Sequence, residues 1–301
     1  MTAAALPAWN VVWQGCAAYA AGGATVVQHD RIRWFATGVG YEGLNGVFIS
    51  PGTPAVPVED AVGTFQRLRV PALWHVGVAD GPAVPPDAEP IARQPGVSWY
   101  EEEPLLVAPV GRYEMPTVDR LSIIPVHDAA GIRAWVRLWS GQGSGPEFEA
   151  TVRARAGAGT AFTHLLAVLA GVPVGCAAAF VGTARDRPWG GEVQHVVTLP
   201  GVRGRGIGTA LTVAALRAIG ARGLGTAVLT SSPDGLRIYQ RLGFSQVGRM
   251  RRYLWSPSAA GNAGMITRPD GARNIAVPSS DVTGRGGYPA QSRVRRPVLP
   301  S

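Results

Sequence analysis

The chain has 301 residues, of which 46% are hydrophobic, and a formal net charge of +8. This length and content exclude an intrinsically disordered chain and predict a globular protein with two domains. No apolar run reaches the roughly 18 residues of a membrane-spanning helix, and the positive charge is scattered, so we expect neither a membrane nor a nucleic-acid partner.

The first unit predicted by the pattern covers residues 1–115. Its start, Thr2–Ala21, is apolar but has no basic residues ahead of it, so we expect an amphipathic helix near 5–20 and no signal peptide. The patterns then predict strands at 32–37, 46–50 and 73–76, helices at 59–69 and 88–93, and a closing hairpin made of 97–100 and 105–110. The acidic run Glu101–Glu103 is expected to be a solvated turn, and attraction of a cationic substrate is the alternative interpretation.

The second unit covers residues 116–256, and residues 257–301 form a tail. Alternation predicts a strand at 119–127, and Asp128 is expected to cap a helix that carries Trp135 and Trp139. A short helix at 147–155 and a hairpin of 164–170 with 174–182 follow, and one or two strands at 247–255 close the unit. The tail is rich in Gly, Pro, Ser and Arg, which predicts disorder.

The stretch from Glu192 to Phe244 predicts a strand, a glycine-rich turn, a long helix, a second strand and a short helix. The turn is Arg203-Gly204-Arg205-Gly206-Ile207-Gly208. Glycines allow the backbone to approach a ligand closely, and the free amides at a helix N-terminus bind anions. Since Arg203 and Arg205 add positive charge, we expect a phosphate or pyrophosphate at this turn.

Two common phosphate-binding loops fit this turn poorly. A Walker loop needs a lysine, and the chain contains none. A dinucleotide-binding fingerprint needs an acidic residue about 20 positions after the glycines, whereas the first acidic residue downstream is Asp234, beyond the next strand.

The turn resembles the acyl-CoA signature of the GCN5-related N-acetyltransferases (GNAT), which is Gln/Arg-x-x-Gly-x-Gly/Ala. Arg203, Gly206 and Gly208 fill that signature in order, and Tyr239-Gln240-Arg241-Leu242-Gly243-Phe244 resembles the family's Tyr-x-x-x-Gly-Phe element. The resemblance implies an α/β fold with a mixed sheet and acetyl-CoA as acyl donor. The order of elements in residues 1–115 resembles the same fold without its glycine loop, since Ser50–Pro54 stands there, which implies two tandem GNAT-like domains with a degenerate N-terminal copy that binds no CoA.

The resemblance also implies where acetyl-CoA binds. Pantetheine would lie along Val196–Leu199, and the pyrophosphate would meet the turn; Ser232 replaces the asparagine that family members often use, and Arg241 is a candidate for a CoA phosphate. The cofactor-binding set is Val197, Thr198, Leu199, Arg203, Gly204, Arg205, Gly206, Ile207, Gly208, Thr209, Ser232 and Arg241.

Three residues are candidates for proton transfer. Tyr239 occupies the family's position for protonating the leaving thiolate, and an aromatic packing role is the alternative. Glu192 lies eleven residues before Arg203, where the histone-acetylating branch has its general base; a solvated residue at the start of a strand is the alternative. His195 is the third candidate, either as a base or as a polar residue that lines the cleft.

The sequence therefore predicts an acetyl-CoA-dependent N-acetyltransferase that acts on an amine by direct attack. A non-catalytic acyl-CoA-binding protein is the alternative, and a protein-interaction role of the tail is a third interpretation. Cys16 and Cys176 form no disulfide pattern, which suits the cytoplasm. The five histidines have no metal-ligand spacing, so no metal is expected.

Overall fold

The structure is a computed structural model. It describes residues 4–20, 25–29, 31–51, 58–78, 90–141, 145–157, 159–182, 189–257, 265–266 and 275–276. Of the predicted tail it describes residue 257 and two short paired strands, β12 (Met265–Ile266) and β13 (Ile275–Ala276). The prediction of disorder falls on the rest of the tail, which lies outside the described residues. In the described part of the chain, no helix is long and apolar enough to span a membrane.

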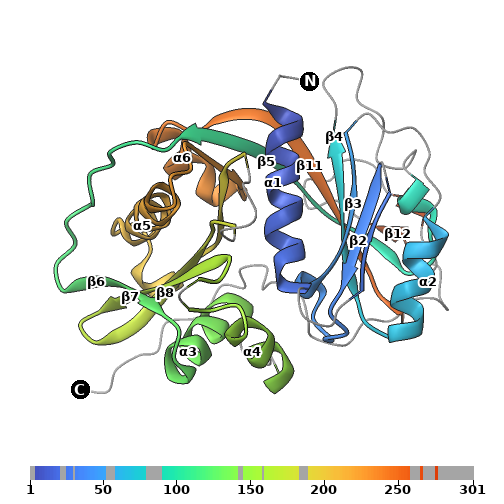
Figure 1. The fold of residues 1–301 in the computed structure, drawn as a ribbon, viewed down its shortest axis with the longest axis horizontal. Helices are drawn as coiled ribbons and strands as arrows, with labels where there is room; N and C mark the ends of the chain where they lie inside the picture. The colour runs from blue at the N-terminus through green and yellow to red at the C-terminus, as the bar shows by residue number, and fades with distance from the viewer. Residues whose placement is uncertain are drawn as a thin grey trace.

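One mixed sheet of eleven strands runs through the molecule in the order β1-β2-β3-β4-β11-β5-β10-β9-β8-β7-β6 (Figure 1). The strands are β1 (Thr25–Gln28), β2 (Ile32–Ala36), β3 (Asn45–Ile49), β4 (Ala72–Val78), β5 (Val97–Pro109), β6 (Leu121–Val126), β7 (Phe162–Leu169), β8 (Val172–Phe180), β9 (Gly191–Thr198), β10 (Thr226–Thr230) and β11 (Ser245–Trp255). The helices are α1 (Ala5–Ala17), α2 (Glu59–Leu68), α3 (Ala129–Ser140), α4 (Pro146–Arg153), α5 (Ile207–Ala221) and α6 (Pro233–Arg241), with short 3₁₀ turns η1 (Ala18–Ala20), η2 (Glu42–Leu44), η4 (Pro90–Arg93) and η5 (Pro200–Val202).

Most of the predicted helices and strands are confirmed. Their apolar residues recur with the period of the element and therefore lie together on the side that the element buries. The Asp128 carboxylate caps α3 by accepting the Gly131 amide at 2.8 Å. Strand β1 was missed, since its short run is mostly exposed. The predicted hairpin of 97–100 with 105–110 is wrong. The acidic residues between these two segments continue a single strand, β5, which pairs with β11 from Val97 to Val107.

The N-terminal half repeats the topology of the C-terminal half. In each, three antiparallel strands lead through a helix into a parallel strand, and a long last strand follows: β1-β2-β3-α2-β4-β5 and then β7-β8-β9-α5-β10-β11. This is a tandem arrangement of two α/β units with the mixed sheet predicted from the sequence.

The two units exchange their last strands. β5, from the first unit, pairs with β10 of the second, and β11, from the second unit, pairs with β4 of the first. The strands β5 and β11 also pair with each other along most of their length. The predicted boundary near residue 115 stays a prediction, but neither half contains all the strands of its own part of the sheet.

Helices cover both faces of the sheet (Figure 1). α1 and α3 pack on one face around Trp9, Trp13, Trp135 and Trp139, in a core that also includes Leu105. α5 and α6 pack on the opposite face of the C-terminal half, where Leu106 and Leu211 belong to the core. α2 covers the N-terminal half in a third core. Figure 1 shows α1 between the two halves, so this N-terminal helix lies against the centre of the sheet.

The prediction of a solvated turn at Glu101–Glu103 is wrong. These residues lie in β5 and pair with arginines of β11: Glu102 with Arg249 and Arg251 at 2.8 Å each, and Glu101 and Glu103 with Arg252 at 3.0 and 2.8 Å. A run of like charges in a sequence suggests a solvated segment. Here the arginine partners lie about 150 residues away in the chain, and the sequence does not show that they are neighbours.

Candidate active site

The glycine-rich turn leads directly into α5, as predicted. Gly204 and Gly206 have φ values of +77° and +84°, which favour glycine, and the amide of Ala210 donates the first bond of the helix to Gly206 O at 2.9 Å. The amides ahead of Ala210 therefore have no acceptor inside the helix and remain available to an anion. A Cβ atom on Gly208 would meet Ile238 of α6 at 3.3 Å, so this turn packs closely against α6.

The strand ahead of the turn separates from its parallel neighbour. β9 and β10 pair only at Gly191–Ala227 and Glu192–Val228, although β9 continues to Thr198 and β10 to Thr230. Beyond these two pairs the strands diverge, and we call this gap in the pairing the β9/β10 split. Among the described strands none pairs with that side of Val193–Thr198, so an extended ligand can pair with this backbone.

A β-bulge lies beside the split. In the β8–β9 pairing, Cys176 opposes Val197 and Ala178 opposes Gln194, so His195 and Val196 together oppose one residue. His195 has a φ of +54°, the left-handed region that strains a residue with a side chain. The bulge re-aims the backbone at the point where β9 leaves β10.

The geometry of the turn fits a pyrophosphate. Arg203 is exposed, its Nε donates to Thr198 O at 3.1 Å, and its guanidinium lies 4.0 Å from the Asp234 carboxylate. Gly206 lies at the surface, and a Cβ there would touch only Val118 and Pro116, at 3.5 and 3.8 Å. The free amides, the absence of a side chain at Gly206 and the exposed guanidinium of Arg203 therefore leave room for the phosphates of acyl-CoA, although Asp234 competes for Arg203.

The remaining predicted cofactor residues lie around this turn. Val197 and Thr198 are half-buried at the end of β9, and Leu199 is exposed. Ile207 is buried and anchors α5, while Arg205 is exposed and Thr209 is half-buried. Ser232 precedes α6 without a side-chain cap bond, and Arg241 is exposed at the end of that helix.

Tyr239 projects from α6 into the core that includes α5 and β10. It is 8% exposed, and its ring meets Phe244 edge-on with 5.8 Å between centroids. A Cβ on Gly235 would lie 2.9 Å from the Tyr239 ring and 3.4 Å from Ser231 Oγ, so the ring lies beside the end of β10. Burial, and then the negative charge of Glu103, raise the pKa of the Tyr239 hydroxyl, so it stays protonated at neutral pH.

Glu192 is buried beneath α1. Its carboxylate accepts a hydrogen bond from Gln194 Nε2 at 2.5 Å and lies directly against the backbone of Gly15. Burial raises the pKa of the Glu192 carboxyl well above its usual range, while Gln194 and Arg252 oppose that rise. The side chain is therefore not solvated at the start of a strand, and with α1 in this position its burial favours the protonated form.

The buried acid predicts a pH-dependent stability difference. Because the folded-state pKa of Glu192 is raised, its contribution to stability is present below about pH 4.5 and is lost as the pH rises toward the folded-state pKa. Relative to the wild type, Glu192→Gln should gain up to about 1.4 kcal/mol per pH unit above that point. Chemical denaturation of both proteins from pH 4 to 8 measures this, and a constant difference would contradict a protonated Glu192.

His195 lies in a cluster of aromatic rings. Its ring is 3.8 Å from Trp139 and 5.7 Å from Trp135, measured between centroids, and Tyr19 lies on the same side. Burial lowers the pKa of His195 to about 3 and that of His164 to about 4. Both imidazoles are therefore neutral and can accept hydrogen bonds, and His195 Nε2 has no partner among the described residues.

The structure brings Tyr239, Glu192 and His195 to the region of the split, but from different sides. Tyr239 comes from the α5/α6 face, whereas Glu192 and His195 pack under α1 and α3. Arg252, Glu101 and Glu103 also belong to this region, and α1 covers it; none of these was predicted there from the sequence. The runs of Glu in β5 and of Arg in β11 indicate that charges could pair, but no pattern in the sequence shows that these two strands are neighbours.

The N-terminal unit has no corresponding split. β3 and β4 pair through four successive residues, from Gly46–Leu73 to Ile49–Val76. The ring of Pro51, two residues after the end of β3, packs directly on Gly77 of β4. Most of the proline-rich segment that replaces the glycine turn lies outside the described residues.

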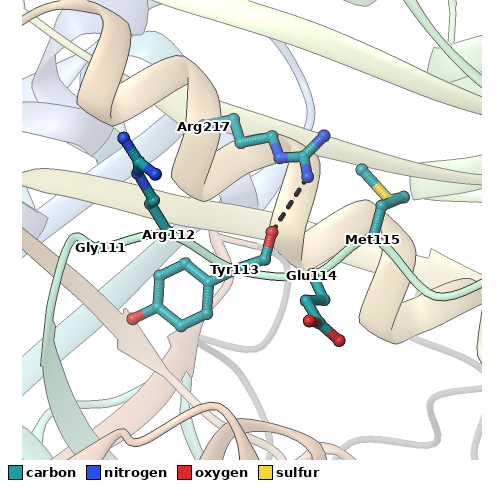
Figure 2. A pocket seen from close by; sticks show the side chains of 6 residues that line it. All are labelled: Gly111, Arg112, Tyr113, Glu114, Met115 and Arg217. Atoms are coloured by element: carbon teal, nitrogen blue, oxygen red, sulfur yellow. Dashed lines mark hydrogen bonds between the residues drawn. The ribbon is translucent and has the colours of Figure 1, made fainter.

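The surface hollow in Figure 2 is separate from this site. It has a volume of about 650 Å³ and lies between residues 111–115 and α5. Arg217 donates to Tyr113 O at 3.0 Å across it. Arg217 is ten residues beyond Ile207, which is about 15 Å along a helix, so this hollow does not include the glycine turn. No group of His, Cys, Asp or Glu that could hold a metal is found in the part of the chain that the structure describes.

The comparisons with known proteins agree with the geometry. Residues 161–246 match a family model described as an acetyltransferase (GNAT) domain. This segment is a GNAT domain. It contains the split, the glycine turn and Tyr239, and the match begins just before β7. No curated protein matches the chain.

Solved structures show that the GNAT fold extends beyond this domain. A GCN5-related N-acetyltransferase from Kribbella flavida is similar with a TM-score of 0.60 and 19% identity, over 85% of this chain and 97% of that chain. A functionally unknown conserved protein from Staphylococcus epidermidis ATCC 12228 has a TM-score of 0.51 and 14% identity, over 79% of this chain and 95% of that chain. At these identities the likeness establishes the fold of both units.

Proposed function

We propose that the protein is an N-acetyltransferase that transfers an acetyl group from acetyl-CoA directly to an amine in a ternary complex. The observation that supports this most is the β9/β10 split, which leads from the glycine turn to the Tyr239 side chain. Acetyl-CoA supplies the activated acetyl group. The turn at residues 203–209 binds the pyrophosphate, and the free backbone edge of Val196–Leu199 pairs with the pantetheine.

Within this proposal, a backbone amide at the bulge polarises the thioester carbonyl. The protonated Tyr239 hydroxyl donates its proton to the departing thiolate. Glu192 and His195 are the proton acceptors proposed from the sequence. Both side chains are buried under α1 and α3, so these helices would have to move before Glu192 or His195 could contact the amine.

The C-terminal unit is the active copy, and the N-terminal unit binds no CoA. The uninterrupted β3–β4 pairing supports this, because it leaves no gap for pantetheine. The proposal places the protein in the cytoplasm, consistent with Cys16 and Cys176 both being free thiols. Its partner is an amine, not a nucleic acid or a membrane.

A non-catalytic acyl-CoA-binding protein is the second candidate. It is favoured by the sealed position of Glu192, whose carboxyl group lies against α1 and Gln194. The two candidates differ in one outcome, since a sensor binds acetyl-CoA but releases no thiol when amines are added.

Gly206 gives a test with a matched control. Gly206→Asp places a carboxylate at the pyrophosphate site, and Gly206→Asn has the same shape and backbone strain without the charge. We expect isothermal titration to show one acetyl-CoA per chain for the wild type, at least about 100-fold weaker binding for the Asp variant, and less than about 10-fold for the Asn variant.

Other outcomes of this titration are also decisive. Two acetyl-CoA per chain would contradict the inactive N-terminal unit. Equal losses in both variants would mean that backbone strain, and not charge, weakens binding. A wild type that binds no acyl-CoA would overturn both candidate functions.

A further inference from the structure

A charged cluster joins the two exchanged strands at the end of β10. Arg252 of β11 lies 3.0 Å from Glu101 Oε1 and 2.8 Å from Glu103 Oε2, both on β5. Its other terminal nitrogen donates to Thr230 Oγ1 at 2.8 Å. Thr230 is the last residue of β10, two residues beyond the last β9–β10 pair. Arg252 therefore holds two carboxylates from the N-terminal unit beside the split of the C-terminal unit.

The carboxylates of Glu101 and Glu103 lie on the α1 face of the sheet. The β5–β11 register is unbroken from Glu101 to Leu105, so these alternate residues share one face. Leu105 belongs to the core with α1 and α3, whereas Leu106 belongs to the core with α5. Because the glycine turn starts α5, the two carboxylates lie on the side of the split opposite the proposed pyrophosphate site.

Buried acceptor atoms lie across the split on the same face. Gln194 Oε1 and His195 Nε2, on β9, have no partner among the described residues. Gln194 is 7% exposed, and it shares the α1 side with Glu192, to which its amide donates. Unsatisfied buried acceptors call for a donor, and an ammonium group has three N–H donors.

Access distinguishes Glu101 from the other carboxylates. Its side chain is 32% exposed, whereas that of Glu103 is 7% exposed and Glu192 is sealed by Gly15 and Gln194. Glu101 can therefore meet a ligand without any movement of α1. Glu103 lies close enough to Tyr239 to act on its hydroxyl, so the cluster extends from Glu101 through Arg252 to the proposed proton donor.

We propose that Glu101, which the N-terminal unit contributes through the strand exchange, binds the acceptor ammonium and takes its proton. This inference rests on the proposed N-acetyltransferase function and assigns its base to a residue outside the GNAT domain. It also gives the degenerate unit a chemical role, because the active copy is incomplete without β5. The acceptor is then a primary amine that enters from the α1 face as a cation.

The proton balance of the reaction is closed by these groups. Glu101 takes one proton from the ammonium, and the free amine forms a C–N bond with the thioester carbonyl carbon. As the C–S bond breaks, the thiolate takes the Tyr239 proton, and the second proton that leaves the nitrogen restores Tyr239. Glu101 releases its proton to solvent, so one proton is released per acetyl transferred.

The electrostatic setting suits this role. Burial and the neighbouring Glu103 raise the pKa of Glu101 to about 7, against the opposing effect of Arg252. A base with a pKa near the working pH accepts protons most effectively. Apart from the two glutamates, the charge of Arg252 also acts on Cys16 of α1 and on His75 of β4. Both of these side chains are uncharged, because burial shifts their pKa values.

Glu101→Gln tests the inference, with Glu102→Gln as the matched control. The control removes the same charge from the next residue of the same strand, but on the opposite face and with Arg249 and Arg251 as partners. The readouts are acetyl-CoA binding by calorimetry and thiol release with phenethylamine, spermidine and an N-terminally free peptide from pH 5.5 to 9. Circular dichroism confirms that each variant folds.

We expect both variants to bind acetyl-CoA as the wild type does. Glu101→Gln should lower kcat/KM at least 100-fold and abolish the rise in rate near pH 7, while Glu102→Gln should keep both the wild-type kcat/KM and that rise. An active wild type whose pH profile survives in Glu101→Gln would overturn the inference and leave the proposed function intact. A wild type that binds acetyl-CoA but acetylates none of the amines would contradict the proposed enzyme and this inference with it.

Discussion

Gly15→Ala should destabilise the protein by about 3 kcal/mol and lower its melting temperature by roughly 6–12 °C. Gly15 lies in α1 at the point where the helix crosses β9. A Cβ atom there would overlap Glu192 Oε2 and lie 2.6 Å from Gln194 Nε2. These side chains are buried and hydrogen-bonded to each other, so neither can move aside without losing that bond. The helix must instead lift from the sheet.

Gly40→Ala is the control for this substitution, because a Cβ at Gly40 would meet nothing within 4 Å. Its effect should stay within about 0.5 kcal/mol. In a Glu192→Ala background, Gly15→Ala should cost less, since the nearest atom is gone. Thermal and urea unfolding of the wild type, the three single variants and the Gly15→Ala/Glu192→Ala double variant measure these differences. Equal losses for Gly15→Ala in both backgrounds would mean that α1 does not rest on Glu192.

Arg252→Ala should cost about 3–5 kcal/mol, because it leaves Glu101 and Glu103 without their shared cation. The Arg252 side chain is 19% exposed and that of Glu103 is 7% exposed, so water replaces little of the lost interaction. The same substitution also removes side-chain contacts that help to fix the register of β5 against β11. Urea unfolding at pH 7 measures the loss.

Arg249→Ala provides the comparison, since it lies three residues earlier on β11 and its side chain is 40% exposed. Its partner Glu102 keeps a second arginine, Arg251, so we expect a loss of about 1 kcal/mol or less. Lowering the pH should shrink the Arg252→Ala effect, because protonated carboxyls no longer need the cation. Losses of equal size in the two variants would contradict the buried character of the Arg252 cluster.

Local sequence patterns were sufficient for most of the C-terminal unit. The glycines at 204, 206 and 208 specify a turn that few other residues can adopt, and the apolar stripe after them specifies α5. Tyr239 lies in the last turn of α6, and Phe244 follows Gly243 directly after that helix, so the reversal of the chain brings the two rings together. The glycine turn and the packing around Tyr239 depend on neighbours in sequence, and so their conformation was predictable.

The environment of each catalytic candidate depended on contacts between distant residues. Glu192 at the start of a strand is solvated or sealed according to where α1 packs, and α1 is about 170 residues away in the chain. His195 needed the aromatic side chains of α3 before its lowered pKa could be assigned.

The elements, the tandem repeat and the glycine turn could be predicted from the sequence, because these follow from periodicity and from backbone conformations that only certain residues tolerate. The tertiary structure alone decided the exchange of β5 and β11, the roof formed by α1 and the pairing of Glu101 and Glu103 with Arg252. Strand order in a sheet is a matter of long-range packing: β5 carries the same alternating pattern whether it lies beside β4 or beside β10. Only the folded chain places Glu101 and Glu103 of one unit beside the β9/β10 split of the other.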